Sequence, residues 1–295
     1  IRKRLSESNI VFDFDAVIGR GGLLKPLEGG VYLVNENMKK DLRNAPMDHA
    51  CNLGGLLADA IAQECGCKAF IADPVVVDEM DCVSRYTGIP EIKRISVFHA
   101  LNSKACSRKY AASIAKKYED LNLIVAHIGG GISVSAHKRG RVVDVNNALN
   151  GEGPFSTERA GTIPAGQLVD LCFSGKYSKQ QIMKLIHGRG GMTAYFGNND
   201  MITISSMAEN GEKEYVNVLN AMIYTIAKQI GAMFVTLEGN VDAIILTGGI
   251  AHSKYCMALL EKRIGFLGNI VIMPGENEIE SLAYNAFGVL KGEIQ

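Results

Sequence analysis

The pattern of apolar and polar positions in the first 120 residues predicts short strands that alternate with helices. Short apolar runs predict strands at 31–34, 69–72 and 94–98, and a further apolar run occupies 10–14. Helical patterns occupy 47–65 and 103–119. Residues 17–30, between the apolar runs 10–14 and 31–34, are glycine-rich and predict a loop around Arg20.

The pattern changes after residue 121, where strands follow one another closely. Strands at 123–126, 132–136 and 141–145, separated by tight turns, predict an antiparallel meander. A mostly helical stretch extends over 164–238. The remainder alternates strand and helix, which is typical of a parallel arrangement, with elements at 241–246, 253–263, 270–273 and 279–291. We therefore expect an α/β fold with a domain boundary near residue 120.

Two segments have a composition that could be taken for a membrane element. Residues 215–237 are apolar-rich, but polar residues interrupt them and the apolar positions recur every three or four residues. This spacing predicts a buried amphipathic helix. The chain starts without Met, and its first residues, Ile1-Arg2-Lys3-Arg4, precede no apolar signal-peptide core, so we expect it to begin inside a domain.

Composition and charge exclude several classes of protein. The hydrophobic fraction of 47% and the charged fraction of 21% are ordinary for a globular chain. Because 31 basic residues balance 31 acidic ones, the chain lacks the charge of a general nucleic-acid binder, and the absence of Trp argues against a base-stacking surface. We expect neither nucleic acid nor membrane as a partner. Seven irregularly spaced cysteines predict reduced thiols in a cytoplasmic protein.

The first candidate site is a glycine-rich corner that begins at His127. Gly129, Gly130 and Gly131 follow it and join two predicted strands. Consecutive glycines let backbone N–H groups approach phosphate oxygens closely, and His127 could donate to a phosphoryl group in transfer. A plain hairpin turn is the alternative interpretation.

The second corner is Thr247-Gly248-Gly249, which ends an apolar strand and opens a helix. Nucleotides commonly lie at such a strand–glycine–helix junction, at the carboxyl edge of a sheet. Close packing of helix on strand is the alternative. The segment is neither a Walker loop nor a GxGxxG fingerprint.

Two arginines and a glutamate lie in further glycine-rich segments. Arg159 and Arg20 are each held among small residues, where a guanidinium could bind an anion bidentately. A surface ion pair of Arg159 with Glu158 or Glu152 is the alternative. Glu276, after Pro-Gly, is expected to cap the following helix, with contact to a ribose or a metal as the second interpretation.

The order of these corners carries a resemblance to a known family. A His-x-Gly-Gly-Gly hairpin that precedes a strand–Thr-Gly-Gly–helix unit resembles the nucleotide cleft shared by actin, hexokinase and acetate kinase. The whole chain resembles the butyrate kinases of the acetate kinase family. The stretches that carry this likeness are VIGRGGLLKPLEGGVY, HACNLGG, VFHALNSK, VAHIGGGISVSAHKRGRVVDVNNALNGEGPFSTERAG, ILTGGIAHS and MPGENEIESLA.

The resemblance implies two ribonuclease-H-like lobes around a nucleotide cleft. The first lobe, 1–120, would lie on the carboxylate side and be incomplete, because the chain starts downstream of the family's first phosphate loop. The second lobe, 121–295, would bind the nucleotide, with the last helix packing back on the first lobe. A truncated chain, a cytoplasmic location and a homo-oligomer are the corresponding expectations.

The resemblance also implies a reaction and roles for the candidate residues. ATP and a short-chain carboxylate, butyrate or a branched analogue, would give acyl phosphate and ADP reversibly, with Mg²⁺. His127, Arg20 and Arg159 would bind the phosphoryl group in transit. The nucleotide would contact the remaining candidates, Gly129, Gly130, Gly131, Thr247, Gly248, Gly249 and Glu276. The carboxylate is already ionised at neutral pH, so no general base is required.

Metal ligands stay unassigned, because His99 follows Phe98 where acetate kinases carry Asp. Two other functions stay open at this point. One is a non-catalytic nucleotide-binding relative. The other is a sugar kinase of the same superfamily, which would need an Asp base to activate a hydroxyl group.

Overall fold

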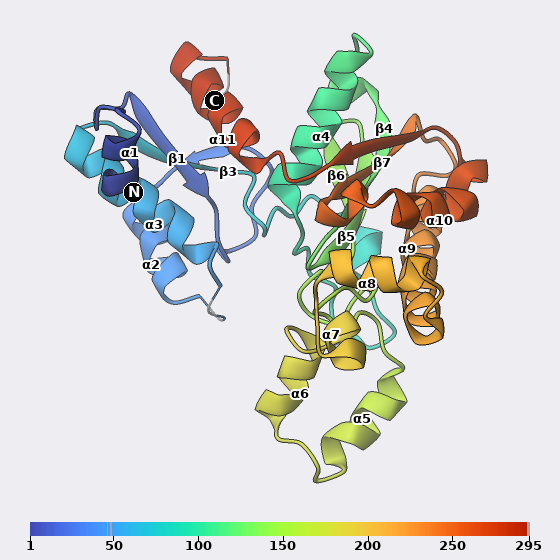
Figure 1. The fold of residues 1–295 in the computed structure, drawn as a ribbon. Helices are drawn as coiled ribbons and strands as arrows, with labels where there is room; N and C mark the ends of the chain where they lie inside the picture. The colour runs from blue at the N-terminus through green and yellow to red at the C-terminus, as the bar shows by residue number, and fades with distance from the viewer. Residues whose placement is uncertain (46, 48, 294–295) are drawn as a thin grey trace. The chain divides into compact units, whose positions relative to one another are not determined.

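The chain folds into two compact units, and each combines strands with helices, which confirms the α/β class (Figure 1). The computed structural model describes residues 1–45, 47 and 49–293. One unit contains Ile1–Val77 together with Asn277–Gln295, and the other contains Asp78–Glu276.

The division between the units differs from the expected boundary at residue 120. Helix α4 (Ala100–Ser113) precedes that residue but packs on β4 (Asn122–Ile128) and β7 (Ala243–Gly248) in the second unit. Helix α11 (Glu278–Lys291) comes from the far end of the chain and packs on β1 (Ala16–Arg20) in the first unit. The units therefore follow packing partners and not the order of the chain.

The first unit is built on a three-stranded sheet with the order β1-β3-β2. Strand β3 (Lys68–Ala72) pairs in parallel with β1 and antiparallel with β2 (Val31–Leu33). Apart from α11, the helices of this unit are α1 (Arg2–Glu7), α2 (Glu36–Arg43) and α3 (Asn52–Cys65).

Glycines around Arg20 serve close packing in this unit, and the loop expected at 17–30 is in its first part the strand β1. A side chain at Gly19 would overlap the backbone of Gly54 in α3, and one at Gly54 would overlap the backbone of Arg20. Helix and strand therefore approach each other at bare backbone. The high glycine content reflects this approach and not a mobile loop.

The second unit is built on a five-stranded sheet with the order β6-β5-β4-β7-β8. Strands β4, β5 (Ile132–Lys138) and β6 (Arg141–Val145) form the predicted antiparallel meander. Strands β7 and β8 (Ile270–Pro274) continue the sheet in parallel with β4. The helices of this unit besides α4 are α5 (Ala165–Phe173), α6 (Lys179–Ile186), α7 (Gly191–Phe196), α8 (Met201–Glu209), α9 (Lys213–Thr236) and α10 (Lys254–Ile264).

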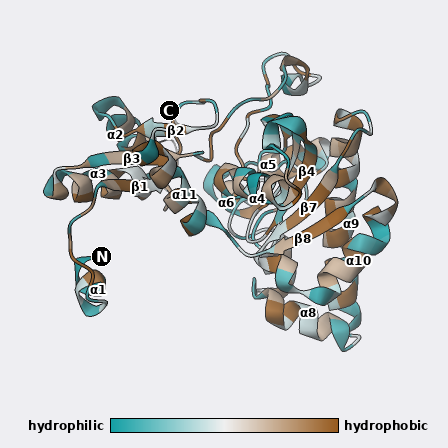
Figure 2. Ribbon diagram, turned by 90° about the horizontal axis from the view of Figure 1, so that it is seen from above, coloured by the Kyte–Doolittle hydropathy of each residue, from teal (hydrophilic) through white to brown (hydrophobic). Residues whose placement is uncertain are grey.

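Helices cover both faces of the five-stranded sheet, and the strands of this sheet are largely hydrophobic (Figure 2). Alternate residues of β4 point to opposite faces. Ile124 and Ile128 join the larger core beneath α9 and α10, whereas Leu123 and Val125 join the smaller core beneath α4. This double burial explains why the sequence of β4 is a continuous apolar run.

Helix α9 confirms the amphipathic helix predicted at 215–237. Among the described residues it is the helix that is long and apolar enough to span a membrane by length and composition. It packs against β4, β5, α8 and α10. The residues of the predicted stripe that are buried in this contact are Leu219, Met222, Ile226, Ile230 and Met233.

Three local predictions differ from the structure. The apolar run at 10–14 forms no strand. The segment predicted as a strand at 94–98 is irregular: Nη1 of Arg94 forms an ion pair with Oδ1 of Asp144 at 2.9 Å, and Ile95 is exposed. The helix predicted at 47–65 begins at Asn52, and residue 48 of that range lies outside the described residues. All seven cysteines are free thiols, as expected.

Candidate active site

Strand register brings the two glycine-rich corners together at one edge of the five-stranded sheet. In the parallel pair β4–β7, His127 lies beside Thr247, although 120 residues separate them along the chain. Thr247 is in turn paired with Met273 of β8. Parallel strands end at the same edge, so the residues after all three strands meet there, at the position where α/β sheets bind ligands.

The contact between the corners requires glycine at Gly248. Its φ is 91°, and a side chain there would overlap the backbone of Ile128. Gly248 and Gly275 exchange two backbone hydrogen bonds of 3.1 Å. The close-packing interpretation therefore holds for Gly248, whereas an added Cβ at Gly249 would meet no atom within 4 Å, and nucleotide binding at this corner stays a prediction.

His127 is buried, with 1% of its surface exposed. Its Nδ1 lies 2.8 Å from Nδ2 of Asn102 in α4. Its ring stacks on His99 with centroids 3.7 Å apart and planes 9° from parallel. Its Nε2 lies 3.8 Å from Oε1 of Glu276. The imidazole is therefore held on several sides, with Nε2 directed toward the edge of the sheet.

Arg159 lies against the first glycine-rich corner. A Cβ on Gly131 would overlap the Arg159 guanidinium, and Nη1 donates to the carbonyl oxygen of Ala148 at 2.6 Å. Burial lowers the pKa of Arg159 below its ordinary value, an effect that the charge of Glu158 partly opposes. The sequence alone could not exclude a surface ion pair, but the guanidinium is desolvated beside the loop expected to hold phosphate.

The acidic partners considered for Arg159 are engaged elsewhere. Glu152 forms an ion pair with Arg94. Glu158 accepts a hydrogen bond from the side-chain amide of Asn199. Since a desolvated cation needs a compensating anion, Arg159 is suited to a negatively charged ligand.

The expected capping role of Glu276 is wrong. The N-cap of α11 is Asn277, and 55% of the Glu276 side chain is exposed. The carboxylate faces His127 of the same unit instead. Its predicted contact with a nucleotide stays a prediction.

Sequence reasoning missed Glu278, which is the partner of Arg20. Nη1 of Arg20 lies 3.0 Å from Oε2 of Glu278, whose side chain is 10% exposed in the first turn of α11. Both residues belong to the first unit, whereas the other candidates belong to the second. Glutamates at 276, 278 and 280 precede or begin the helix, and the sequence does not tell which of them is buried.

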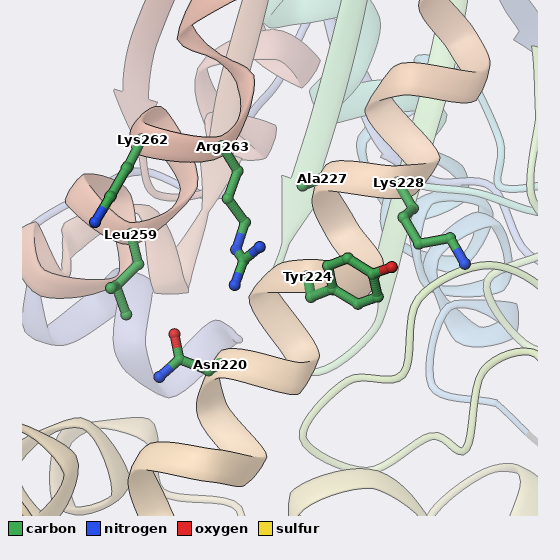
Figure 3. Close-up of a pocket in the computed structure, with 7 residues that line it drawn as sticks. All are labelled: Asn220, Tyr224, Ala227, Lys228, Leu259, Lys262 and Arg263. Carbon is green, nitrogen blue, oxygen red and sulfur yellow. The ribbon is translucent and has the colours of Figure 1, made fainter.

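A separate hollow of about 530 Å³ lies between α9 and α10 (Figure 3). None of the predicted site residues lines it. Its wall carries three cationic side chains and one aromatic ring, and the residues are Asn220, Tyr224, Ala227, Lys228, Leu259, Lys262 and Arg263.

The described residues contain no group of three or more His, Cys, Asp and Glu side chains that could hold a metal ion.

Comparison with known proteins places the chain in a family. Residues 87–285 match the family model that is described as the Acetokinase family. The chain belongs to the acetokinase family. A probable butyrate kinase of Phocaeicola vulgatus is 67% identical over 294 residues, which are 100% of this chain and 83% of that protein. Butyrate kinase 2 of Clostridium acetobutylicum is 51% identical over 295 residues, covering 99% of this chain and 83% of that protein.

Solved structures confirm the fold of this acetokinase family member. Acetate kinase of Porphyromonas gingivalis matches with a TM-score of 0.82 at 21% identity, over 94% of this chain and 78% of that one. A propionate kinase of Francisella tularensis matches with a TM-score of 0.78 at 18% identity, over 95% and 81%. The chain therefore has the fold of these kinases, as the resemblance to the acetate kinase family implied, and the site residues are argued from their geometry.

Proposed function

We propose that this protein transfers the γ-phosphoryl group of ATP to a short-chain carboxylate, butyrate or a branched analogue, and forms acyl phosphate and ADP reversibly. The observation that carries the proposal is the meeting of His127, Arg159 and the two glycine-rich corners at one sheet edge. Relatives named butyrate kinase, at 51–67% identity over the whole chain, support the choice of acceptor.

The chemistry of the site suits transfer between two anions. The transferring phosphoryl group carries its charge on equatorial oxygens, so cations and hydrogen-bond donors stabilise it more than a base does. Arg159 supplies a desolvated cation and His127 a ring N–H. An added Cβ at Gly130 would meet no atom closer than 4.0 Å, so phosphate oxygens could approach the backbone there, and Thr247 to Gly249 would contact the nucleoside. Arg20, oriented by Glu278, is the predicted second cation.

Magnesium would enter the site with the nucleotide. When bound, it would neutralise charge on the phosphate oxygens, and its protein ligands stay unassigned. Assembly into homo-oligomers, a cytoplasmic location and the absence of nucleic-acid or membrane partners stay predictions.

A direct assay tests the proposal. ATP-dependent formation of acyl hydroxamate is measured with acetate, butyrate and isobutyrate. We expect turnover with butyrate or isobutyrate to exceed that with acetate. His127→Ala should lower turnover about 100- to 1,000-fold, the loss typical of one transition-state donor. Nucleotide binding without hydroxamate from any of the three acids would favour a non-catalytic relative, and unchanged turnover in His127→Ala would refute the role of His127.

A further inference from the structure

Asn102 joins the two glycine-rich corners through its side-chain amide. It lies on α4 with no exposed surface. Its Nδ2 is 2.8 Å from Nδ1 of His127 and 3.2 Å from Oγ1 of Thr247. The sulfur of Cys106 lies 3.7 Å from its Oδ1. A buried amide in such contacts fixes the direction of every hydrogen bond that it makes.

The direction of this network follows from a backbone carbonyl, which can only accept. Oγ1 of Thr247 lies 3.1 Å from the carbonyl oxygen of Gly275 and donates its single hydrogen there. Toward Asn102, the hydroxyl must then accept. The Asn102 atom facing it is therefore the donating Nδ2, and the same nitrogen faces His127. Nδ1 of His127 must accept and carries no proton.

The surroundings of the ring accommodate a proton on Nε2. The neutral imidazole with an unprotonated Nδ1 carries its proton on Nε2, which faces the carboxylate of Glu276 at 3.8 Å. On the stacked face lies His99, whose Nδ1 is 2.9 Å from Oγ of Ser133.

We infer that Asn102 is a positioning residue that holds His127 neutral, with its proton on Nε2, so that Nε2–H is the donor offered at the sheet edge. The consequence for phosphoryl transfer rests on the proposed function, but the state of the ring does not. In this arrangement, His127 donates a hydrogen bond to the moving phosphoryl group and gives up no proton. The same amide ties that donor to Thr247 in the second corner.

Nitrogen-15 NMR of the ring nitrogens tests the inference without an activity measurement. The protein has six histidines, so His127 is assigned by its loss in His127→Gln. We expect the wild-type His127 to show an unprotonated Nδ1 and a protonated Nε2. In Asn102→Asp, a carboxylate replaces the donor, and Nδ1 should become protonated. A wild-type spectrum with the proton on Nδ1, or with both nitrogens protonated at neutral pH, overturns the inference.

Kinetics with a matched control test the positioning role. Asn102→Leu should lower kcat about 10- to 100-fold, by analogy with the loss seen when the partner that orients a metal-bound imidazole is removed, with a smaller change in KM. The control is Asn285→Leu, which removes a buried Asn whose amide bonds Ser281 within α11, and it should keep both the spectrum of His127 and kcat.

The outcomes separate the two proposals. Wild-type levels of kcat in Asn102→Leu overturn the positioning role. Equal losses in Asn102→Leu and Asn285→Leu assign the effect to general destabilisation and also overturn it. If Asn102→Leu does not fold, the wild-type and Asn102→Asp spectra still decide the tautomer. A wild-type protein that is inactive on all three acids, with the predicted spectrum, refutes the proposed function alone.

Discussion

Replacement of Gly131 by Ala should disable the site while leaving the fold nearly intact. The new methyl group would occupy the volume of the Arg159 guanidinium, so the guanidinium must move away from the loop. Gly131 has no positive φ, and Ala is compatible with its backbone. The displaced group is the end of a flexible side chain, which can rotate aside without moving the sheet.

Two magnitudes follow from this geometry. Loss of one correctly placed donor or cation at a transition state costs about 2.7–4 kcal/mol, or about 100- to 1,000-fold in turnover. The folded state loses the hydrogen bond from Arg159 to Ala148, and charged hydrogen bonds contribute about 1.5–3 kcal/mol at most. Because water can solvate a guanidinium that turns outward, we expect a loss of stability at the lower end of that range.

The measurements are hydroxamate formation for turnover and urea denaturation for stability. Gly231→Ala in α9 is the control, since no atom lies within 4 Å of its added methyl group. Arg159→Ala should lose as much turnover as Gly131→Ala, and the double variant should lose little more. Turnover in Gly131→Ala within about twofold of wild type, with Arg159→Ala inactive, would show that the guanidinium does not need its present position.

Three further predictions concern buried titratable side chains. Lys104→Met should lower the free energy of unfolding in urea by about 3–5 kcal/mol, because Glu79, 2.8 Å from the ammonium, stays buried and loses its cationic partner. Burial lowers the pKa of His137 to about 3 from 6.5, so between these pH values the imidazole binds a proton in the unfolded chain but not in the folded protein. The free energy of unfolding should therefore fall as pH drops from 6.5 toward 3. His137→Gln should flatten this slope in urea titrations at several pH values. Glu278→Gln should lower turnover by up to about 100-fold through misplacement of Arg20, and unchanged kinetics would contradict that role.

The sequence predicted the second unit well because its elements have strong periodic patterns. The meander and α9 show the spacings of two and of three to four residues that strands and amphipathic helices require. The strand at Arg20 was missed because its glycines, which allow α3 to approach, are the residues that usually mark loops. The strand predicted at 94–98 was wrong because the apolar residues of this segment do not share one buried face: Ile95 is exposed and Phe98 is buried.

The candidate site was predictable where chemistry and glycine occur together, as at His127 and Arg159. Asn102 gave no such signal, since its sequence neighbours Leu101 and Ser103 are those of an ordinary buried helix. Its role depends on the register of β4 against β7, which no local pattern specifies. Glu278 differs from Glu276 only by its place relative to the start of α11, and sequence boundaries are least certain at helix ends.

The pairing of His127 with Thr247 also has a consequence for biosynthesis. Strands β4, β5 and β6 can associate as soon as residues 122–145 have been made, since their contacts are local. Contacts between segments that are far apart in sequence close long loops and form slowly. A nascent chain therefore displays a completed meander with the His127 corner long before β7 emerges from the ribosome, and the pairing of His127 with Thr247 forms only after residues 243–248 have been made.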